Sequence, residues 1–181
     1  PKLVVLGSER GDRGTKSFYT ARYQWIDRWL VFNLADGFCA NSQFGRHLLI
    51  TYGCRKKIVV IPNVVDPAAI DLQPVISVRE IYNWPPSSTL CCLVSRLVDY
   101  KGIDDFINFV KMCKQDIRFL IIGDGPERER LGSLVRGLSL NDRVVFMGQL
   151  NPVVPYVKNT DICVLSTRES EDCSNSILEY M

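Results

Sequence analysis

Short apolar runs alternate with segments of helical periodicity over the second half of the chain. The predicted strands are apolar runs rich in β-branched and aliphatic residues, at 89–94, 117–122, 143–147 and 161–165. The predicted helices lie between and after them, at 102–114, at 126–138, in a short stretch before residue 161, and from Ser174 onward. Strands that alternate with helices form a parallel sheet covered on both faces, so this pattern predicts an α/β, Rossmann-like fold.

The first third of the chain shows the same alternation around a more aromatic helix. The predicted elements are a strand at 2–6 that ends at Gly7, a helix at 18–34, a strand at 36–40, a helix from the N-cap Ser42 to about Gly53, and a strand at 57–61. In the helix at 18–34, apolar residues recur at helical spacing, and further aromatic residues extend the stripe to a second side. This helix is therefore expected to be largely buried.

A proline-rich segment separates the two regions. Residues 66–88 contain Pro67, Pro74, Pro85 and Pro86 and show weak periodicity, which is the composition of an interdomain linker. We therefore expect residues 1–66 to form the C-terminal part of one Rossmann-like domain, residues 67–88 to be a linker, and residues 89–181 to form a second domain.

Composition and charge are those of an ordinary globular protein. The net charge of +2 is too small to indicate nucleic acid as the main partner. The cysteines are odd in number and have no zinc-ligand spacing, at Cys39, Cys54, Cys91, Cys92, Cys113, Cys163 and Cys173. They are interpreted as small buried hydrophobic residues, which fits a reducing compartment and predicts a cytoplasmic protein without bound zinc.

Candidate chemistry follows the predicted strands, because ligands of parallel α/β sheets bind beyond the carboxyl ends of the strands. Arg96 and Lys101 follow the strand at 89–94, and two cations at this edge suit a diphosphate. The alternative is that both are ordinary surface cations near the start of a helix. After the next strand, Gly123 and Gly125 form a G-x-G, but Arg128 stands where the dinucleotide fingerprint requires a third glycine. A nicotinamide or flavin cofactor is therefore disfavoured, and the glycines are interpreted as a tight turn.

A second candidate site lies at 166–179, where carboxylates crowd a loop before a helix. Ser174 can cap this helix, Asn175 and Glu179 then share one face, and Glu171 lies beside the helix N-terminus. Sugar hydroxyls donate to carboxylates, and phosphates are attracted to free helix N–H groups. The alternative is an acidic cap on a surface helix.

Taken in order, five motifs resemble those of family 4 glycosyltransferases. They are Ile61-Pro-Asn-Val-Val-Asp66, Ser95-Arg-Leu-x-x-x-Lys101-Gly102, Gly123-Asp-Gly-Pro126, Arg143-Val-Val-Phe-Met-Gly148 and Glu171-x7-Glu179. The resemblance covers roughly residues 36–181. It implies the GT-B fold, in which an N-terminal acceptor domain and a C-terminal donor domain face a cleft, and it makes this chain a fragment with the end of the first domain and most of the second. Such a fragment is expected to be inactive by itself.

The resemblance also implies a reaction and the roles of individual residues. The expected reaction is transfer of a hexose from a UDP- or GDP-sugar to a saccharide or lipid-linked acceptor, with retention of configuration and with no cofactor or metal. Arg96 and Lys101 would bind the diphosphate and stabilise the leaving group, and Glu171 would orient the sugar hydroxyls. The remaining donor contacts would come from Glu179 at the ribose, from Gly148 and Gln149 near the base, and from the main chain of Cys173, Ser174 and Asn175 at the phosphates.

Some features depart from the family pattern or leave alternatives open. Ser95 and Val64 replace glycines, and Asp172 with Cys173 replaces the usual Gly-Phe. A nucleotide-sugar 2-epimerase of the same architecture and a non-catalytic nucleotide-sugar-binding module are the alternative functions. The basic loop and aromatic helix at 7–34 resemble bacterial members that build surface polysaccharides, and they also fit peripheral contact with a membrane surface.

Overall fold

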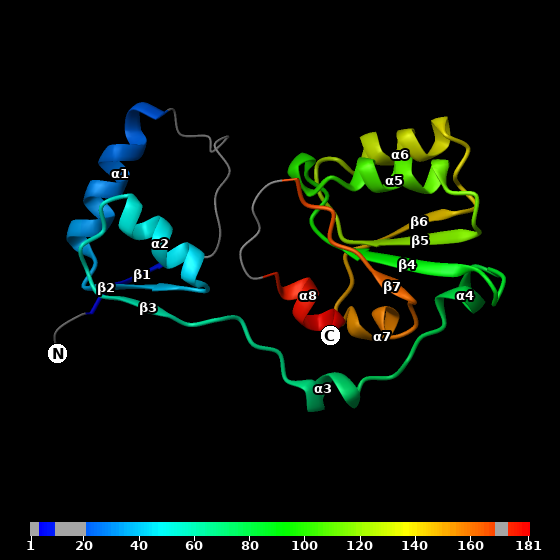
Figure 1. Ribbon diagram of the computed structural model, residues 1–181, viewed down its shortest axis with the longest axis horizontal. Coiled ribbons are helices and arrows are strands. Elements are labelled where there is room, and N and C mark those ends of the chain that lie inside the picture. The colour runs from blue at the N-terminus through cyan, green and yellow to red at the C-terminus, as the bar shows by residue number, and fades with distance from the viewer. Residues whose placement is uncertain (1–3, 10–20, 169–173) are drawn as a thin grey trace. The chain divides into compact units, whose positions relative to one another are not determined.

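The computed structural model describes residues 4–9, 21–168 and 174–181 (Figure 1). The chain divides into two compact units. Unit 1 extends to Val64, and unit 2 begins at Val65 and includes Asn175–Met181.

Unit 2 is built on a four-stranded parallel sheet with the order β6-β5-β4-β7. Its strands are β4 (Thr89–Val94), β5 (Ile117–Ile122), β6 (Val144–Gly148) and β7 (Ile162–Cys163). Because β5 and β6 extend the sheet to one side of β4 and β7 lies on the other, the strand order reverses between β4 and β7. In sheets of this kind such a switch point is where ligands bind.

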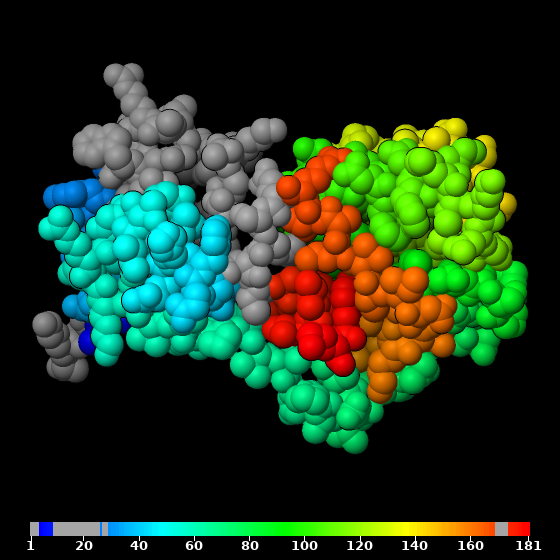
Figure 2. Space-filling view, in the orientation of Figure 1, coloured from blue at the N-terminus to red at the C-terminus, as the bar shows by residue number. Residues whose placement is uncertain are grey.

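Helices cover both faces of this sheet, as the sequence pattern predicts (Figure 1). One face carries α5 (Ile103–Met112) and α6 (Arg128–Gly137), and the other carries α4 (Val78–Ile81), α7 (Val154–Val157) and α8 (Asn175–Tyr180). Figure 2 shows α7 and α8 next to each other on the surface of unit 2. Alternate residues of each strand therefore enter two different cores.

The two cores can be followed along β4 and β5. Leu93 and Phe119 face the core formed with α5 and α6, whereas Leu90, Cys92 and Leu120 face the core formed with α4 and α7. Burial on both faces explains why these strands appear in the sequence as continuous apolar runs rather than as alternating ones.

The segment that we expect to be a linker, 67–88, carries two short helices and bonds to unit 2. The helix α3 (Pro67–Asp71) has Asp66 as its N-cap, and α4 has Ser77. The Lys158 ammonium donates to the main-chain oxygens of Ile70, Asp71 and Gln73 over 3.0–3.3 Å. Contacts with the end of α7 thus hold this proline-rich segment in place.

Unit 1 contains a three-stranded parallel sheet with the order β1-β2-β3, formed by β1 (Leu6–Glu9), β2 (Gly37–Ala40) and β3 (Ile58–Val60). Helix α1 (Ala21–Leu34) precedes β2, and α2 (Gln43–Thr51) precedes β3. Ser42 caps α2 as predicted, because its Oγ accepts from the Gly45 N–H at 2.9 Å.

The first strand differs from its prediction. It runs through Gly7 rather than ending there, and Gly7 pairs with Phe38 of β2. A Cβ on Gly7 would come within 2.2 Å of the Phe38 ring, so the glycine permits close packing inside the strand rather than terminating it.

Candidate functional site

The switch point of the unit 2 sheet lies at its carboxyl edge, where the pairing of β4 with β7 ends. The two strands pair at Cys91 with Ile162 and at Cys92 with Cys163, and their chains then continue into the loop 95–102 and the segment 164–168. This is the switch point of the sheet, so the structure places the loop that carries Arg96 and Lys101 at the edge predicted for ligand binding.

Arg96 and Lys101 have different surroundings within this loop. Arg96 is exposed, and among the described residues its guanidinium forms no hydrogen bond or ion pair. Lys101 is half-buried at the end of the short 3-10 helix η1 (Asp99–Lys101), with its ammonium 5.5 Å from the centre of the Tyr100 ring. The loop at this switch point thus carries an exposed guanidinium with no counter-charge among the described residues, which suits an anionic ligand.

The chain after β7 is bonded to the same loop. The Ser166 hydroxyl donates to the Lys101 carbonyl at 2.7 Å, and the Arg168 N–H donates to the Tyr100 carbonyl at 2.8 Å. Gly102 allows the two segments to approach, because it has a φ of 61° and a Cβ there would lie 2.3 Å from the Ser166 carbonyl oxygen. The segment after β7 and the loop after β4 are therefore bonded to each other at the switch point.

Arg168 strengthens this connection through its side chain. Its guanidinium donates to Asp105 at 2.6 Å and to Asp104 at 2.9 Å, and it lies 3.6 Å from an oxygen of Asp99. The hydrogen bond from Arg168 lowers the pKa of Asp105, and the same contact raises the pKa of Arg168. Arg168 is therefore already neutralised by protein carboxylates, in contrast to Arg96.

This cluster was not predicted from the sequence. The signal that could have found it is an arginine after one parallel strand and three aspartates after its neighbour, since both loops leave the sheet at the same edge.

The glycines after β5 serve backbone packing. Gly123 has a φ of 136°, and a Cβ there would lie 1.9 Å from the Ser95 carbonyl oxygen; a Cβ on Gly125 would lie 2.4 Å from the carbonyl oxygen of Leu97. The Leu97 N–H donates in turn to the Asp124 carbonyl at 2.9 Å. The G-x-G therefore brings the loop after β5 against the loop that carries Arg96.

Gly148 and Gln149 lie at the same edge of the sheet. Gly148 ends β6 with a φ of 72°, and its carbonyl accepts from the Gly123 N–H at 2.7 Å. Gln149 follows and is exposed. The residues expected near the base are thus at the carboxyl edge, beyond β5 as seen from Arg96.

Helix α8 carries Asn175 and Glu179 to the end of β4. Two of its side chains bond to Val94: Ser176 Oγ donates to the Val94 carbonyl and Tyr180 Oη accepts from the Val94 N–H, both at 2.8 Å. Glu179 is half-buried, and this burial raises the pKa of its carboxyl group. Ser174 directly precedes the helix, whereas Glu171 and Cys173 lie outside the described residues.

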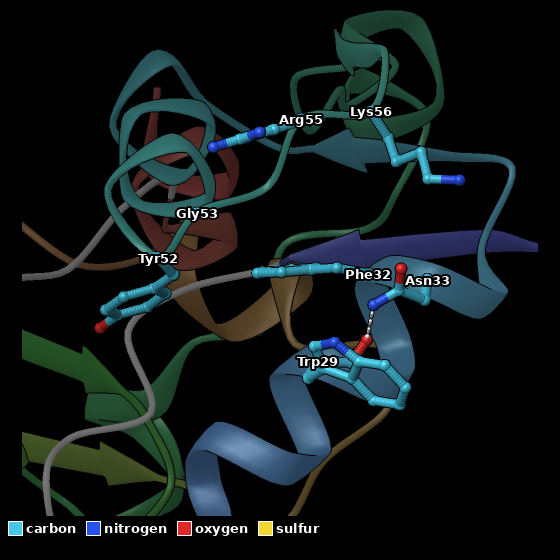
Figure 3. Close-up of a pocket in the computed structure, with 7 residues that line it drawn as sticks. All are labelled: Trp29, Phe32, Asn33, Tyr52, Gly53, Arg55 and Lys56. Carbon is cyan, nitrogen blue, oxygen red and sulfur yellow. Dashed lines mark hydrogen bonds between the residues drawn. The ribbon is translucent and has the colours of Figure 1, made fainter.

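Unit 1 has a pocket of its own, of about 380 Å³ (Figure 3). It is lined by the end of α1 and the turn after α2, through Trp29, Phe32, Asn33, Tyr52, Gly53, Arg55 and Lys56. The side-chain amide of Asn33 donates to the Trp29 carbonyl at 2.6 Å. Because α1 and α2 end just before β2 and β3 begin, this pocket lies toward the amino edge of its sheet, and it contains none of the residues predicted for the site.

The described residues contain neither a metal-ligand cluster nor a membrane-spanning helix. Within them, no group of three or more His, Cys, Asp or Glu side chains is arranged to hold a metal ion. No helix in the same ranges has the length and apolar character needed to cross a bilayer.

Comparison with known proteins places both parts of the chain. The sequence model described as "Glycosyl transferases group 1" matches residues 88–181, and the model "Glycosyltransferase Family 4" matches residues 7–69. N-acetyl-alpha-D-glucosaminyl L-malate synthase of Bacillus anthracis is 27% identical over 128 residues, which cover 70% of this chain and 33% of that protein. A phosphatidylinositol N-acetylglucosaminyltransferase component of Arabidopsis thaliana is 33% identical over 148 residues, which cover 77% of this chain and 30% of that protein.

Among solved structures, Anabaena HepE in complex with UDP superimposes with a TM-score of 0.75 at 19% identity, covering 98% of this chain and 50% of that one. The same protein in complex with UDP-glucose gives a TM-score of 0.74 at 22% identity, covering 88% of this chain and 47% of that one. The chain thus spans about a third of the two curated relatives and about half of HepE. The fold is GT-B, and the chain belongs to the group 1 glycosyltransferases, whose sequence model covers the whole of the sheet that carries Arg96 and Lys101.

Proposed function

We propose that the full protein is a glycosyltransferase and that unit 2 binds its nucleoside-diphosphate-sugar donor at the switch point between β4 and β7. The observation that carries the proposal is the unneutralised Arg96 guanidinium at this switch point, in the same loop as Lys101. Support also comes from HepE, a protein of the same fold that has been solved with UDP and with UDP-glucose.

The chemistry follows from the charge that appears when the sugar leaves. Breaking the bond between the anomeric carbon and the diphosphate places negative charge on the leaving oxygen, and cations fixed nearby stabilise that charge in the transition state. In the proposal Arg96 and Lys101 have this role. Arg168 does not, because its charge is already balanced by Asp104 and Asp105.

Other residues would orient the donor around the diphosphate. Glu179, on α8, would accept hydrogen bonds from the ribose hydroxyls, and Asn175 with Ser174 and Cys173 would bring main-chain N–H groups to the phosphates. Gly148 and Gln149 would contact the base, and Glu171 would orient the hydroxyls of the transferred sugar. Transfer would retain the anomeric configuration, with the leaving phosphate accepting the proton of the acceptor hydroxyl.

The names of the relatives suggest which substrates to test first. The names of both curated relatives contain an N-acetylglucosaminyl group, and one of them also contains phosphatidylinositol. We therefore propose a UDP-sugar donor, with UDP-N-acetylglucosamine and UDP-glucose as the first candidates, and a saccharide or lipid-linked acceptor. We also propose a cytoplasmic location with peripheral membrane contact, which the free thiols of the six described cysteines and the aromatic α1 support.

The test is a donor screen on the full-length protein. Calorimetry with UDP, UDP-sugars and GDP-sugars measures binding, and NMR of the product identifies its anomer. Binding of one donor followed by transfer with retention is the expected result. Three results would contradict the proposal: no binding of any donor, an inverted product, and release of the 2-epimer of the donor sugar without an acceptor, which would indicate an epimerase.

A further inference from the structure

The end of β4 has an unusual set of hydrogen-bond partners. Toward β7, the carbonyl of Leu90 accepts from the Asp161 N–H at 2.9 Å and that of Cys92 accepts from the Val164 N–H at 2.8 Å. Side-chain and hydrogen-bond directions repeat every second residue in a strand, so Val94 presents the next N–H and C=O in the same direction. The strand β7 has ended by then, since its last pairing with β4 is Cys92 with Cys163.

Two hydroxyl groups of α8 take the place of the missing strand. Tyr180 Oη accepts from the Val94 N–H and Ser176 Oγ donates to the Val94 carbonyl, each at 2.8 Å. The two residues are four positions apart and therefore share one side of the helix. Both are half-buried, and Tyr180 also packs into the core that contains Leu90 and Cys92.

The neighbouring side of the same helix carries the residues proposed to contact the donor. Asn175 and Glu179 each precede a member of the hydroxyl pair by one residue, which is a rotation of about 100° around the helix. Fixing Ser176 and Tyr180 against β4 therefore also fixes the direction in which Glu179 projects. Val94, the β4 residue that bonds to both hydroxyl groups, is only two residues before Arg96.

We propose that Ser176 and Tyr180 are positioning residues of the donor site, which bond α8 to the end of β4 and so set the placement of Glu179 relative to Arg96. This inference rests on the proposed function. It assigns to the pair no contact with the donor itself. Its consequence is that loss of either hydroxyl weakens donor binding through the geometry of the site.

The test uses Tyr180→Phe and Ser176→Ala in the full-length protein, because each removes one hydroxyl and keeps most of the packing. Tyr82→Phe is the matched control: Tyr82 packs against the same core but lies on the segment before β4. Calorimetry measures the Kd for UDP, and steady-state kinetics measure KM for the UDP-sugar and for the acceptor. Thermal unfolding reports the folded fraction of each variant.

Each of the two variants is expected to raise the Kd for UDP and the donor KM by about three- to tenfold, the range of one ordinary hydrogen bond. The acceptor KM of both variants should stay near that of the wild type. In Tyr82→Phe, the Kd for UDP and the donor KM should also stay near the wild-type values. Ser176→Thr retains a hydroxyl and should restore most of the lost affinity. If one variant fails to fold, the other carries the test.

The outcomes separate the inference from the function on which it rests. A wild-type protein that binds no UDP or UDP-sugar overturns the proposed function, and the inference with it. A wild-type protein that binds UDP, with folded Tyr180→Phe and Ser176→Ala variants of unchanged Kd and donor KM, overturns the inference alone. Equal weakening by Tyr82→Phe would also overturn it, since the effect would then be general destabilisation.

Discussion

The Ser166 hydroxyl donates a 2.7 Å hydrogen bond to the main-chain carbonyl of Lys101, although 65 residues separate the two in the sequence. This contact joins the segment after β7 to the loop after β4, and these are the two chain segments that border the switch point of the sheet. The main chain of Lys101, one of the two residues proposed to bind the diphosphate, is therefore bonded to the segment after β7. A ligand placed there would meet a loop whose main chain is already fixed, which reduces the ordering cost of binding.

Arg96→Ala and Lys101→Ala, made separately in the full-length protein, are expected to lower kcat by about 10²- to 10³-fold, the usual cost of removing one group that stabilises transition-state charge. The stability of Arg96→Ala should change little, because Arg96 is exposed and has no partner among the described side chains. Lys114→Ala is the control, since Lys114 is exposed and lies before the amino end of β5. Steady-state kinetics measure the effect. Near-wild-type turnover in both variants would remove these residues from the proposed diphosphate site.

Arg168→Ala is expected to weaken UDP binding by about fivefold, equivalent to about 1 kcal/mol, because it removes the side-chain bonds from the segment after β7 to the loop of Lys101 and leaves Asp105 without its counter-charge. The unfolding free energy should fall by less, since the Arg168 side chain is 38% exposed and water screens the ion pairs. Calorimetry measures the affinity for UDP, and titrations at low and at high salt measure how far salt reduces the effect of the substitution.

Arg136→Ala provides the control for Arg168→Ala. Arg136 is exposed on α6, where its guanidinium donates to Ser133 at 2.9 Å. Equal UDP affinity in Arg168→Ala and Arg136→Ala would show that the Arg168 contacts do not organise the site.

Much of the unit 2 sheet could be predicted from the sequence. The bounds of β4 and β5 agree with their predictions. Strands buried on both faces are continuous apolar runs, so the local sequence alone is enough to predict them. The prediction of 161–165 is too long for β7, which is only Ile162–Cys163, because the ladder stops where β7 diverges from β4. That divergence depends on the packing of the following segment and has no local signal.

In the candidate site, too, local features could be predicted from the sequence and contacts between distant residues could not. Arg96 and Lys101 could be identified because their position after a strand is a local feature that the parallel topology carries to one edge. The contacts of Arg168 with Asp105 and of Tyr180 with Val94 join residues 63 and 86 positions apart. These contacts could be identified only from the structure, which brings the distant segments together.

Gly123→Ala and Gly137→Ala are expected to have opposite effects on stability. A Cβ on Gly123 would lie 1.9 Å from the Ser95 carbonyl oxygen, at a φ of 136°, so this substitution should lower the unfolding free energy by about 2–4 kcal/mol. Gly137 ends α6, and a Cβ there would meet nothing within 4 Å. Its substitution should raise stability by up to about 1 kcal/mol. Chemical denaturation measures both, and a destabilised Gly137→Ala would contradict the helical packing described for α6.

The raised pKa of Glu179 predicts how donor binding depends on pH. Burial disfavours the charged carboxylate, so its pKa lies above the ordinary glutamate value in the folded protein. If the carboxylate accepts hydrogen bonds from the ribose, UDP affinity should fall as the pH drops through this raised pKa, before ordinary glutamates are protonated. Glu179→Gln should bind more weakly at neutral pH and lack this step, and Glu129→Gln on the exposed side of α6 should retain it.

Stability should respond to pH in the opposite sense. A carboxyl group whose pKa is raised by folding contributes stability in its protonated form, and this contribution is lost as the pH rises through the folded-state pKa. The Tm of the wild type should therefore fall relative to that of Glu179→Gln as the pH increases across this range. Calorimetric titrations and thermal scans over one pH series test both signs together. A step in UDP affinity that persists at the same pH in Glu179→Gln would assign the titration to another group and remove Glu179 from the ribose contact.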